Sequence, residues 1–525
     1  MNSKFNRFLF SLPCRIVLIV MAFFATFHFY LYQDFHYFID NATFVGCVYL
    51  LTALLALASL FVLFSEWIYT LGKREWKKYY LILFYIAVCF VVLFTLVNLV
   101  FSILLNTPIQ MFRKNFLLMA PYFGVLGTIV VVAFTFALAN KKKVVACILA
   151  GLIGGMTIFA AVFSWDMIVF KFESEPVVFD VGDGYRIVWA TTDEAVGYVK
   201  YTYLDEEYTI FDEDSGRINS IETIHNVFVP YEHLQNNKYT VYSTRMLNNN
   251  AYGPRSGKTI EVTKNFKGVF SNDFNITIIS DTHNVREYCF DAPAKEDTDL
   301  LIMLGDFCDY ISDDQAIADY LLWPCNRVSK GEIPVLFAKG NHDNRGESAS
   351  RLQDLLGFES FYYQTYFGDY RFTILDSGEC NPDNFAEFGV VANFEKYREK
   401  QLEYLESLDK ETGKYDILVV HNPAFGTSKE EVERYNNVLD DFGVDIQLSG
   451  HTHKYAFSEE GYKGEKDFDN ITSVPVLVSA GVVGDFFKHD LHYTTIHVKD
   501  DVLKFDNKSY KKGKIDSDSL IITKS

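Results

Sequence analysis

The second half of the chain contains five apolar runs that each end in residues able to bind a metal ion. Runs that are apolar along their whole length are typical of strands covered on both faces of a sheet. Open α/β folds form their sites beyond the carboxyl ends of such strands, so we expect the following side chains to converge. These side chains follow their runs in this order: Asp281 and His283 after 275–280, Asp306 and Asp309 after 300–304, Asn341, His342 and Asp343 after 334–339, His421 after 416–420, and His451 and His453 after 444–449.

The donor groups in this set are carboxylates, imidazoles and an amide, which borderline and hard divalent ions prefer. The set contains no cysteine, which argues against a structural zinc site built on thiolates. Gly305, Gly340 and Gly450 stand directly before ligand residues, where the backbone must pass close to an ion. We therefore expect two divalent metal ions, and Mn, Fe, Zn and Ni all suit these donors.

The same residues fall into five short motifs in a fixed order. The motifs resemble the signature of the calcineurin-like metallophosphoesterase superfamily over roughly residues 272–505. The resemblance implies an α/β domain built as a four-layer αββα sandwich, and a metal-dependent phosphohydrolase acting on a phosphomonoester or a phosphodiester. The motifs are Asp281-x-His283, Gly305-Asp306-x-x-Asp309, Gly340-Asn341-His342-Asp343, His421 alone, and Gly450-His451-x-His453.

The resemblance also implies a role for each matching residue. His342 would stand beside the phosphate as a general acid or electrostatic clamp, and Asp343 would orient it through a hydrogen bond. The implied reaction is hydrolysis of a phosphate ester by attack of a metal-bridging hydroxide on phosphorus. The first metal would be held by Asp281, His283 and His453, the second by Asn341, His421 and His451, and both by Asp306.

One position departs from the purple acid phosphatases, which this chain otherwise resembles in part. Those enzymes place a tyrosine three residues after the bridging aspartate, where it binds ferric iron and gives the colour. This chain has Asp309 at that position, so we expect a colourless enzyme. Arg286 and Arg345 directly follow ligand loops, and each is either a phosphate contact or a surface residue.

Residues 171–265 have the pattern of a small β domain. Short β-rich runs recur about every ten residues between turn signals, which predicts a β-sandwich. The segment resembles a fibronectin type III domain, particularly the small domain before the catalytic domain of purple acid phosphatases. Trp189 is expected in its core and Tyr239 at a tyrosine corner, and a spacer role is favoured over a ligand site. The expected strands are 185–190, 197–203, 208–211, 223–229 and 239–245.

Residues 1–170 contain five apolar stretches long enough to cross a bilayer as helices, which takes ~20 residues. Alternate loops carry ten basic residues against two, and the positive-inside tendency then places the amino terminus in the cytoplasm. The sequence therefore predicts an integral membrane protein with the lipid bilayer as a partner and the catalytic domain outside the cytoplasm. The stretches are roughly 16–33, 44–65, 79–105, 116–138 and 144–165.

Charge is distributed unevenly along the 525 residues. The first 170 residues carry a net charge of +7, while the remaining residues carry −26. Such an acidic second part argues against nucleic-acid binding. No protein partner can be identified from the sequence.

Together these patterns predict a multi-domain fold. Its parts would be an α-helical transmembrane bundle at 1–170, a fibronectin III-like β-sandwich at 171–265 and the metallophosphoesterase domain at 270–525. The predicted function is a membrane-anchored dimetal phosphoesterase acting on a soluble or lipid-linked phosphoester. The alternative is a non-catalytic membrane receptor or sensor for a phosphorylated ligand.

Overall fold

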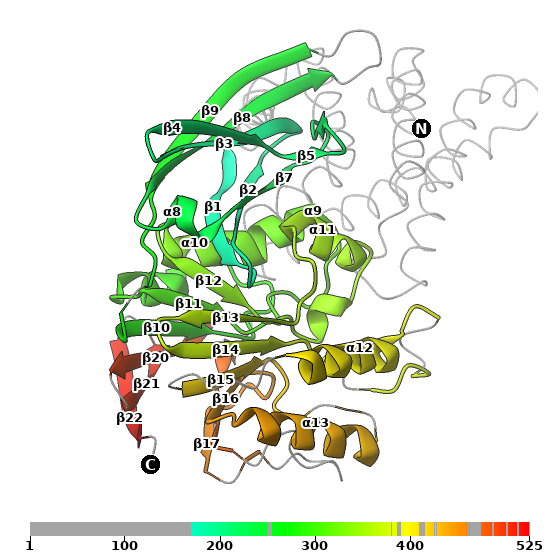
Figure 1. The fold of residues 1–525 in the computed structure, drawn as a ribbon, viewed down its shortest axis with the longest axis vertical. Helices are drawn as coiled ribbons and strands as arrows, with labels where there is room; N and C mark the ends of the chain where they lie inside the picture. The colour runs from blue at the N-terminus through cyan, green and yellow to red at the C-terminus, as the bar shows by residue number, and fades with distance from the viewer. Residues whose placement is uncertain are drawn as a thin grey trace, which may run out of the picture. The chain divides into compact units, whose positions relative to one another are not determined.

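The computed structural model describes residues 170–525, except for 249–254, 270, 287, 380, 386–389, 409–414, 425, 427, 460, 463–473, 486–487, 500–501, 512–513 and 524–525. The five predicted membrane spans all lie outside these described residues. The described residues fall within one compact unit of the chain, and Figure 1 shows its ribbon.

The larger sheet places three of the predicted metal-binding strands side by side. Strands β10, β11 and β12 are parallel neighbours, and their side chains are mostly buried. The antiparallel strand β20 flanks β10 and leads through β21 to β22 at the sheet edge, while β19 pairs with β20. The bounds are β10 Asp273–Ile279, β11 Leu300–Met303, β12 Pro334–Phe337, β19 Gly481–Asp485, β20 Lys488–Lys499, β21 Val502–Lys511 and β22 Lys514–Thr523.

A second sheet carries the other two predicted metal-binding strands, β15 and β16. Its strand order is β13-β14-β15-β16-β18-β17, and the four strands from β14 to β18 in this order are parallel. The ring of Phe274 in β10 meets that of Tyr370 in β14 at a centroid distance of 5.5 Å, so the two sheets pack together. The bounds are β13 Tyr363–Phe367, β14 Tyr370–Leu375, β15 Tyr415–Val420, β16 Ile446–Ser449, β17 Ala456–Ser458 and β18 Val476–Val478.

Helices cover both sheets. Helix α10 contacts β1, β11 and β12 of the first sheet, and α12 and α13 share an apolar core with β14 and β15 of the second. The Ser428 hydroxyl caps α13 by accepting a hydrogen bond from the Glu431 amide, and Gly443 ends it at a φ of +68°. The helices are η2 Tyr288–Asp291, η3 Pro293–Lys295, α9 Asp314–Ile317, η4 Ala318–Leu322, α10 Trp323–Ser329, η5 His342–Asn344, η6 Ala349–Arg351, α11 Leu352–Leu356, α12 Phe394–Ser407 and α13 Lys429–Phe442.

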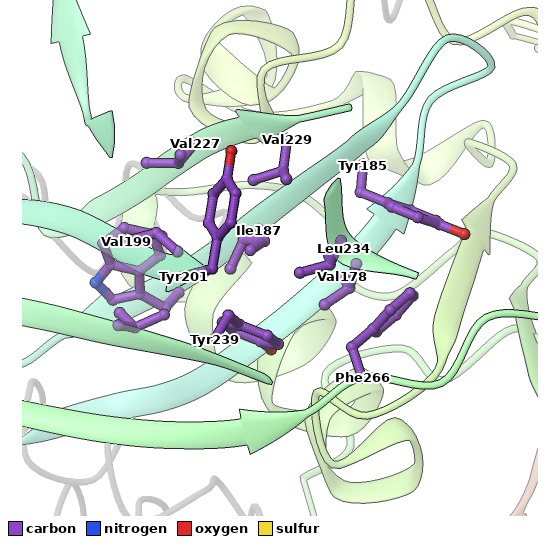
Figure 2. Close-up of a cluster of buried hydrophobic side chains, with 12 residues drawn as sticks. Val178, Tyr185, Ile187, Val199, Tyr201, Val227, Val229, Leu234, Tyr239 and Phe266 are labelled. Atoms are coloured by element: carbon purple, nitrogen blue, oxygen red, sulfur yellow. The ribbon is translucent and has the colours of Figure 1, made fainter. Parts of the chain in front are cut away.

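The strands that precede β10 in the chain form two further β layers, which enclose one apolar core (Figure 2). Strands β1, β2 and β7 form one layer, and β4, β3, β8 and β9 form the other. Trp189 is fully buried between them, as predicted, and its indole N–H donates to the Ser243 hydroxyl at 2.8 Å. The bounds are β1 Phe172–Asp180, β2 Tyr185–Thr191, β3 Ala195–Tyr203, β4 Glu206–Phe211, β5 Glu213–Asp214, β6 Arg217–Ile218, β7 Ile224–Val229, α8 Tyr231–Leu234, β8 Lys238–Asn248 and β9 Arg255–Asn265.

This β region is continuous with the larger sheet. Strand β1 pairs in parallel with β12, with Val178 opposite Pro334 and Phe179 opposite Val335. Tyr239 does not make the local bond of a tyrosine corner, because its hydroxyl donates to the carbonyl of Gly331, 92 residues away. The β region is therefore joined to the following domain by main-chain pairing and by this buried hydrogen bond.

The predicted fold class needs correction. Among the described residues, no helix is long and apolar enough to cross a membrane. The long helices α12 and α13 have 14 residues each, which at about 1.5 Å per residue falls short of a bilayer core. The described part is mostly β-sheet with a metallophosphoesterase-like fold in its carboxy-terminal region, and not the predicted series headed by a transmembrane bundle.

Candidate metal centre

The predicted ligands begin where neighbouring strands end. In the first sheet, Ile279 lies opposite Met303 and Met303 opposite Phe337, so β10, β11 and β12 end at nearly the same level. In the second sheet, Val419 of β15 lies opposite Leu448 of β16. The loops that leave these strands therefore meet at one edge, where open α/β folds bind their ligands.

Asp281, His283 and His453 form a first cluster. Their ligand atoms all lie within 4.8 Å of one another. The Nε2 atoms of the two histidines are 3.1 Å apart, and Nε2 of His453 lies 3.6 Å from an Asp281 oxygen. These three residues are the set predicted for the first metal, and the structure brings them together.

A second cluster consists of Asp306, His421 and His451, whose ligand atoms also lie within 4.8 Å of one another. The amide oxygen of Asn341 joins it, at 2.9 Å from Nδ1 of His451. Nδ1 of His421 hydrogen-bonds to the Leu304 carbonyl. Since a carbonyl only accepts, Nδ1 carries the proton and the ring presents Nε2 to the cluster.

Asp306 lies between the two clusters. Its Oδ2 atom is 3.1 Å from Nε2 of His421 in the second cluster and 3.8 Å from Nε2 of His283 in the first. Its other oxygen accepts a hydrogen bond from the His342 amide at 2.9 Å. One carboxylate thus faces both groups of donors, which is the position expected of a bridging ligand.

The charges of this edge favour a bound cation. Burial acts to lower the pKa of His421, but the carboxylates of Asp306 and Asp281 outweigh it and raise this pKa to about 10. Nε2 of His421 is buried and makes no hydrogen bond of regular geometry. A buried nitrogen of this kind, facing two carboxylates, suits a metal ion. The residues present therefore fit two divalent ions of the Mn, Fe, Zn or Ni type.

Five of the predicted ligands have a left-handed backbone, which non-glycine residues rarely adopt. Such conformations cost roughly 1–3 kcal/mol each and persist where the surrounding structure holds them. They concentrate here because sharp turns aim the side chains back toward the strand ends. The φ angles are +48° at Asp281, +40° at His283, +51° at Asp306, +73° at His451 and +53° at His453.

Two glycines of the motifs make room for the carboxylates of Asp306 and Asp281, whereas the sequence predicted a close approach of the backbone to the metal ions. A Cβ atom at Gly340 would overlap the Asp306 side chain and its amide. A Cβ atom at Gly450 would lie 2.6 Å from an oxygen of Asp281. Any side chain at these positions would therefore displace a predicted ligand.

His342 and Asp309 lie beside the first cluster. The His342 ring packs edge-on against His283 with centroids 4.9 Å apart, and its Nδ1 lies 3.0 Å from the Asp309 carbonyl. The Asp309 carboxylate is 2.9 Å from Nδ1 of His283 and also accepts a hydrogen bond from the side-chain NH₂ of Asn284 at 2.6 Å. Asp309 therefore fixes which nitrogen His283 presents to the cluster, a role that the sequence did not assign.

The hydrogen bond predicted between Asp343 and His342 is not present. The buried Asp343 carboxylate instead accepts from the backbone amides of Gly340 and Asp306, both at 2.9 Å, and of Phe307 at 3.1 Å. It thereby ties the loop after β12 to the loop after β11. The physical reason is that unpaired amides in a tight buried turn need an acceptor more than the partly exposed imidazole does.

The two arginines suggested as phosphate contacts have different surroundings. Arg286 forms ion pairs with the buried carboxylates of Glu173 and Asp319 and lies over the ring of Trp323, with its guanidinium carbon 5.0 Å from the ring centroid. It is a packing residue in this structure. Arg345, by contrast, lies against His342.

Comparison with known proteins agrees with this geometry. Residues 274–455 match the family described as calcineurin-like phosphoesterase. The chain is a metal-dependent phosphohydrolase. Its cofactor is a pair of divalent metal ions, for which the two His/Asp clusters are the candidate ligands. No curated protein matches the sequence.

Several solved structures are similar at low identity. A purple acid phosphatase from yellow lupin seeds is 16% identical with a TM-score of 0.45, covering 66% of this chain and 74% of its own. Vacuolar protein sorting 29 from Cryptosporidium parvum is 12% identical with a TM-score of 0.27, covering 48% and 99%. A cold-active protein-tyrosine phosphatase from a psychrophilic Shewanella is 11% identical with a TM-score of 0.25, covering 66% and 99%.

Proposed function

We propose that the chain hydrolyses a phosphate ester at the edge where its two sheets meet. The observation that carries the proposal is the position of Asp306 between two groups of convergent donors. The first metal is assigned to Asp281, His283 and His453, the second to Asn341, His421 and His451, and Asp306 is assigned to both.

Two divalent ions, when bound, would polarise phosphoryl oxygens and lower the pKa of the attacking water. The chain's own residues supply the rest. His283 is held by Asp309, His421 by the Leu304 carbonyl, and the loops by Asp343, so little reorganisation is needed when an ester binds.

His342 is assigned the proton transfer to the leaving alkoxide. Its Nδ1 faces the Asp309 carbonyl at 3.0 Å, and a carbonyl can only accept a hydrogen bond. The proton on Nδ1 is therefore fixed, and Nε2 is the nitrogen that can give a proton to the alkoxide and regain one from water.

The test uses the purified full chain with Mn, Zn, Fe, Ni or no metal. Hydrolysis of p-nitrophenyl phosphate and bis-p-nitrophenyl phosphate is measured for the wild type, Asp306→Asn and His342→Ala. We expect metal-dependent turnover that Asp306→Asn abolishes, together with weaker metal binding. His342→Ala should lose turnover and keep its metals. Folded wild-type protein that binds no divalent metal would refute the assignment.

The location of the catalytic part outside the cytoplasm stays a prediction, and we propose it only from the basic residues of segment 1–170. A fusion of alkaline phosphatase after Ser525 should be active, because that reporter needs an oxidising compartment. A β-galactosidase fusion at the same place should be inactive. The opposite pair of results would place the catalytic part in the cytoplasm.

A further inference from the structure

Arg345 occupies the position next to the proposed proton donor. Its Nη1 atom lies 3.4 Å from both ring nitrogens of His342. The backbone is fixed as well, because the Arg345 amide donates to the His342 carbonyl at 3.0 Å and its carbonyl accepts from Ile311 at 2.7 Å. The guanidinium therefore has a defined place beside the metal centre and is not a freely rotating surface charge.

A buried carboxylate orients this guanidinium. Nε and Nη2 of Arg345 donate to the two oxygens of Glu379, at 2.6 and 2.9 Å. Glu379 is 1% exposed, whereas Arg345 is 35% exposed. The fork uses one edge of the guanidinium and turns the Nη1 side toward His342, while the side chain stays accessible from solvent.

The segment that carries Glu379 is itself held in place. It follows β14, and the Glu379 carbonyl lies 3.4 Å from Nη1 of Arg398. Arg398 is fully buried and is ion-paired with Glu431 of α13. By contrast, Arg434 forms its ion pairs with Glu399 and Glu406 at the surface, where the three side chains are 40%, 48% and 50% exposed.

We propose that Arg345, oriented by Glu379, binds a non-bridging phosphoryl oxygen and makes the enzyme prefer phosphomonoesters to phosphodiesters. The inference rests on the proposed function, since it takes the substrate phosphate to lie between the metals and His342. A monoester presents three charged non-bridging oxygens, and a diester presents two and carries one charge less. A guanidinium that meets the third oxygen therefore stabilises the monoester more, because a second ester oxygen is a weak acceptor.

The experiment compares the Mn-loaded full-length wild type with Arg345→Ala, Arg345→Lys and Glu379→Gln. One arm measures kcat and KM for p-nitrophenyl phosphate and bis-p-nitrophenyl phosphate. The other measures the binding of orthophosphate by calorimetry, which needs no turnover. Arg434→Ala is the matched control, because it removes an arginine that forms ion pairs at the surface. Both the kinetic constants and the affinity for orthophosphate should stay at wild-type values.

Loss of one charge-assisted hydrogen bond corresponds to a roughly 10–100-fold effect. Arg345→Ala should lower kcat/KM for the monoester by about that factor and weaken orthophosphate binding similarly, with a less than about threefold change for the diester. Arg345→Lys keeps the charge without the fork and should give an intermediate loss. Glu379→Gln should weaken orthophosphate binding less than Arg345→Ala does.

The two arms separate failure of this inference from failure of the proposed function. If Arg345→Ala and Arg345→Lys bind orthophosphate as the wild type does, or lower both esters equally, Arg345 does not select the monoester. The wild type could instead hydrolyse neither ester and still bind orthophosphate in a Mn-dependent way that Arg345→Ala weakens. In that case Arg345 does contact phosphate, but the proposed preference for phosphomonoesters is wrong. If Arg345→Ala fails to fold, the comparison of Arg345→Lys with the wild type decides.

Discussion

Replacing Asp343 by asparagine separates two roles for this residue, one at His342 and one at the backbone. The carboxylate accepts three amide hydrogen bonds, two at one oxygen and one at the other. Asparagine has a single acceptor oxygen, so its NH₂ group must face an amide donor. Losing a hydrogen bond to a charged acceptor and leaving a buried donor unpaired together cost roughly 3–5 kcal/mol.

The loss of these amide hydrogen bonds in Asp343→Asn should weaken metal binding and lower the stability of the Mn-bound protein. Asp343 ties the loop carrying Asp306 to the loop carrying Asn341, and residues that orient metal ligands typically contribute about 10–100-fold to metal affinity. Burial and the nearby Asp306 charge raise the pKa of Asp343 to about 7, so Mn binding is measured at pH 8, where the carboxylate is ionised. Calorimetry should show the weaker affinity, and thermal unfolding should show a smaller Mn-induced rise of the midpoint than in the wild type.

His342→Ala is the comparison variant, because it removes the proposed proton donor and leaves the amide bonds of Asp343 intact. It should bind Mn with wild-type affinity and lose only turnover. The reasoning is refuted if Asp343→Asn also binds Mn and unfolds like the wild type while its kcat falls as in His342→Ala. Asp343 would then act through His342, as the family resemblance had implied.

Two further predictions concern packing and pH. Burial raises the pKa of Asp180 from 3.8 to about 6, so the folded protein loses stability as the pH rises from 4 through 6. In urea unfolding, the free energy of unfolding of Asp180→Asn should therefore exceed that of the wild type by up to about 3 kcal/mol at pH 8. Near pH 4 the two free energies should be equal. A gain for Asp180→Asn that was larger at pH 4 than at pH 8 would contradict the cause. Gly340→Ala should abolish Mn binding, because the methyl group would occupy the place of the Asp306 side chain. Gly216→Ala is the control, because Gly216 lies at a turn with a φ of +79° and no atom within 4 Å of an added Cβ. This variant should lose only about 1 kcal/mol of folding stability and keep its metals. If Gly340→Ala still bound Mn, the loops carrying Asp306 and Gly340 would be able to move apart.

The sequence alone predicted which candidate metal ligands lie close together and which strands carry them. Asp281, Asp306 and His421 each follow an apolar run, and the ends of parallel strands must share one edge of a sheet. Trp189 in the core was predictable for the same local reason, since a strand alternates its faces and a large apolar side chain is driven inward. These inferences need only residue type and periodicity.

Tertiary structure alone decided the partners of the residues around the ligands. Asp343 was assigned to the neighbouring His342, yet its carboxylate binds amides from a loop 36 residues away. Glu379 belongs to no motif, and only the fold brings its carboxylate to Arg345, 34 residues away in the chain. Sequence spacing indicates which residues share a strand or a turn, but hydrogen-bond partners across two sheets are set by packing, which brings together groups distant in the chain.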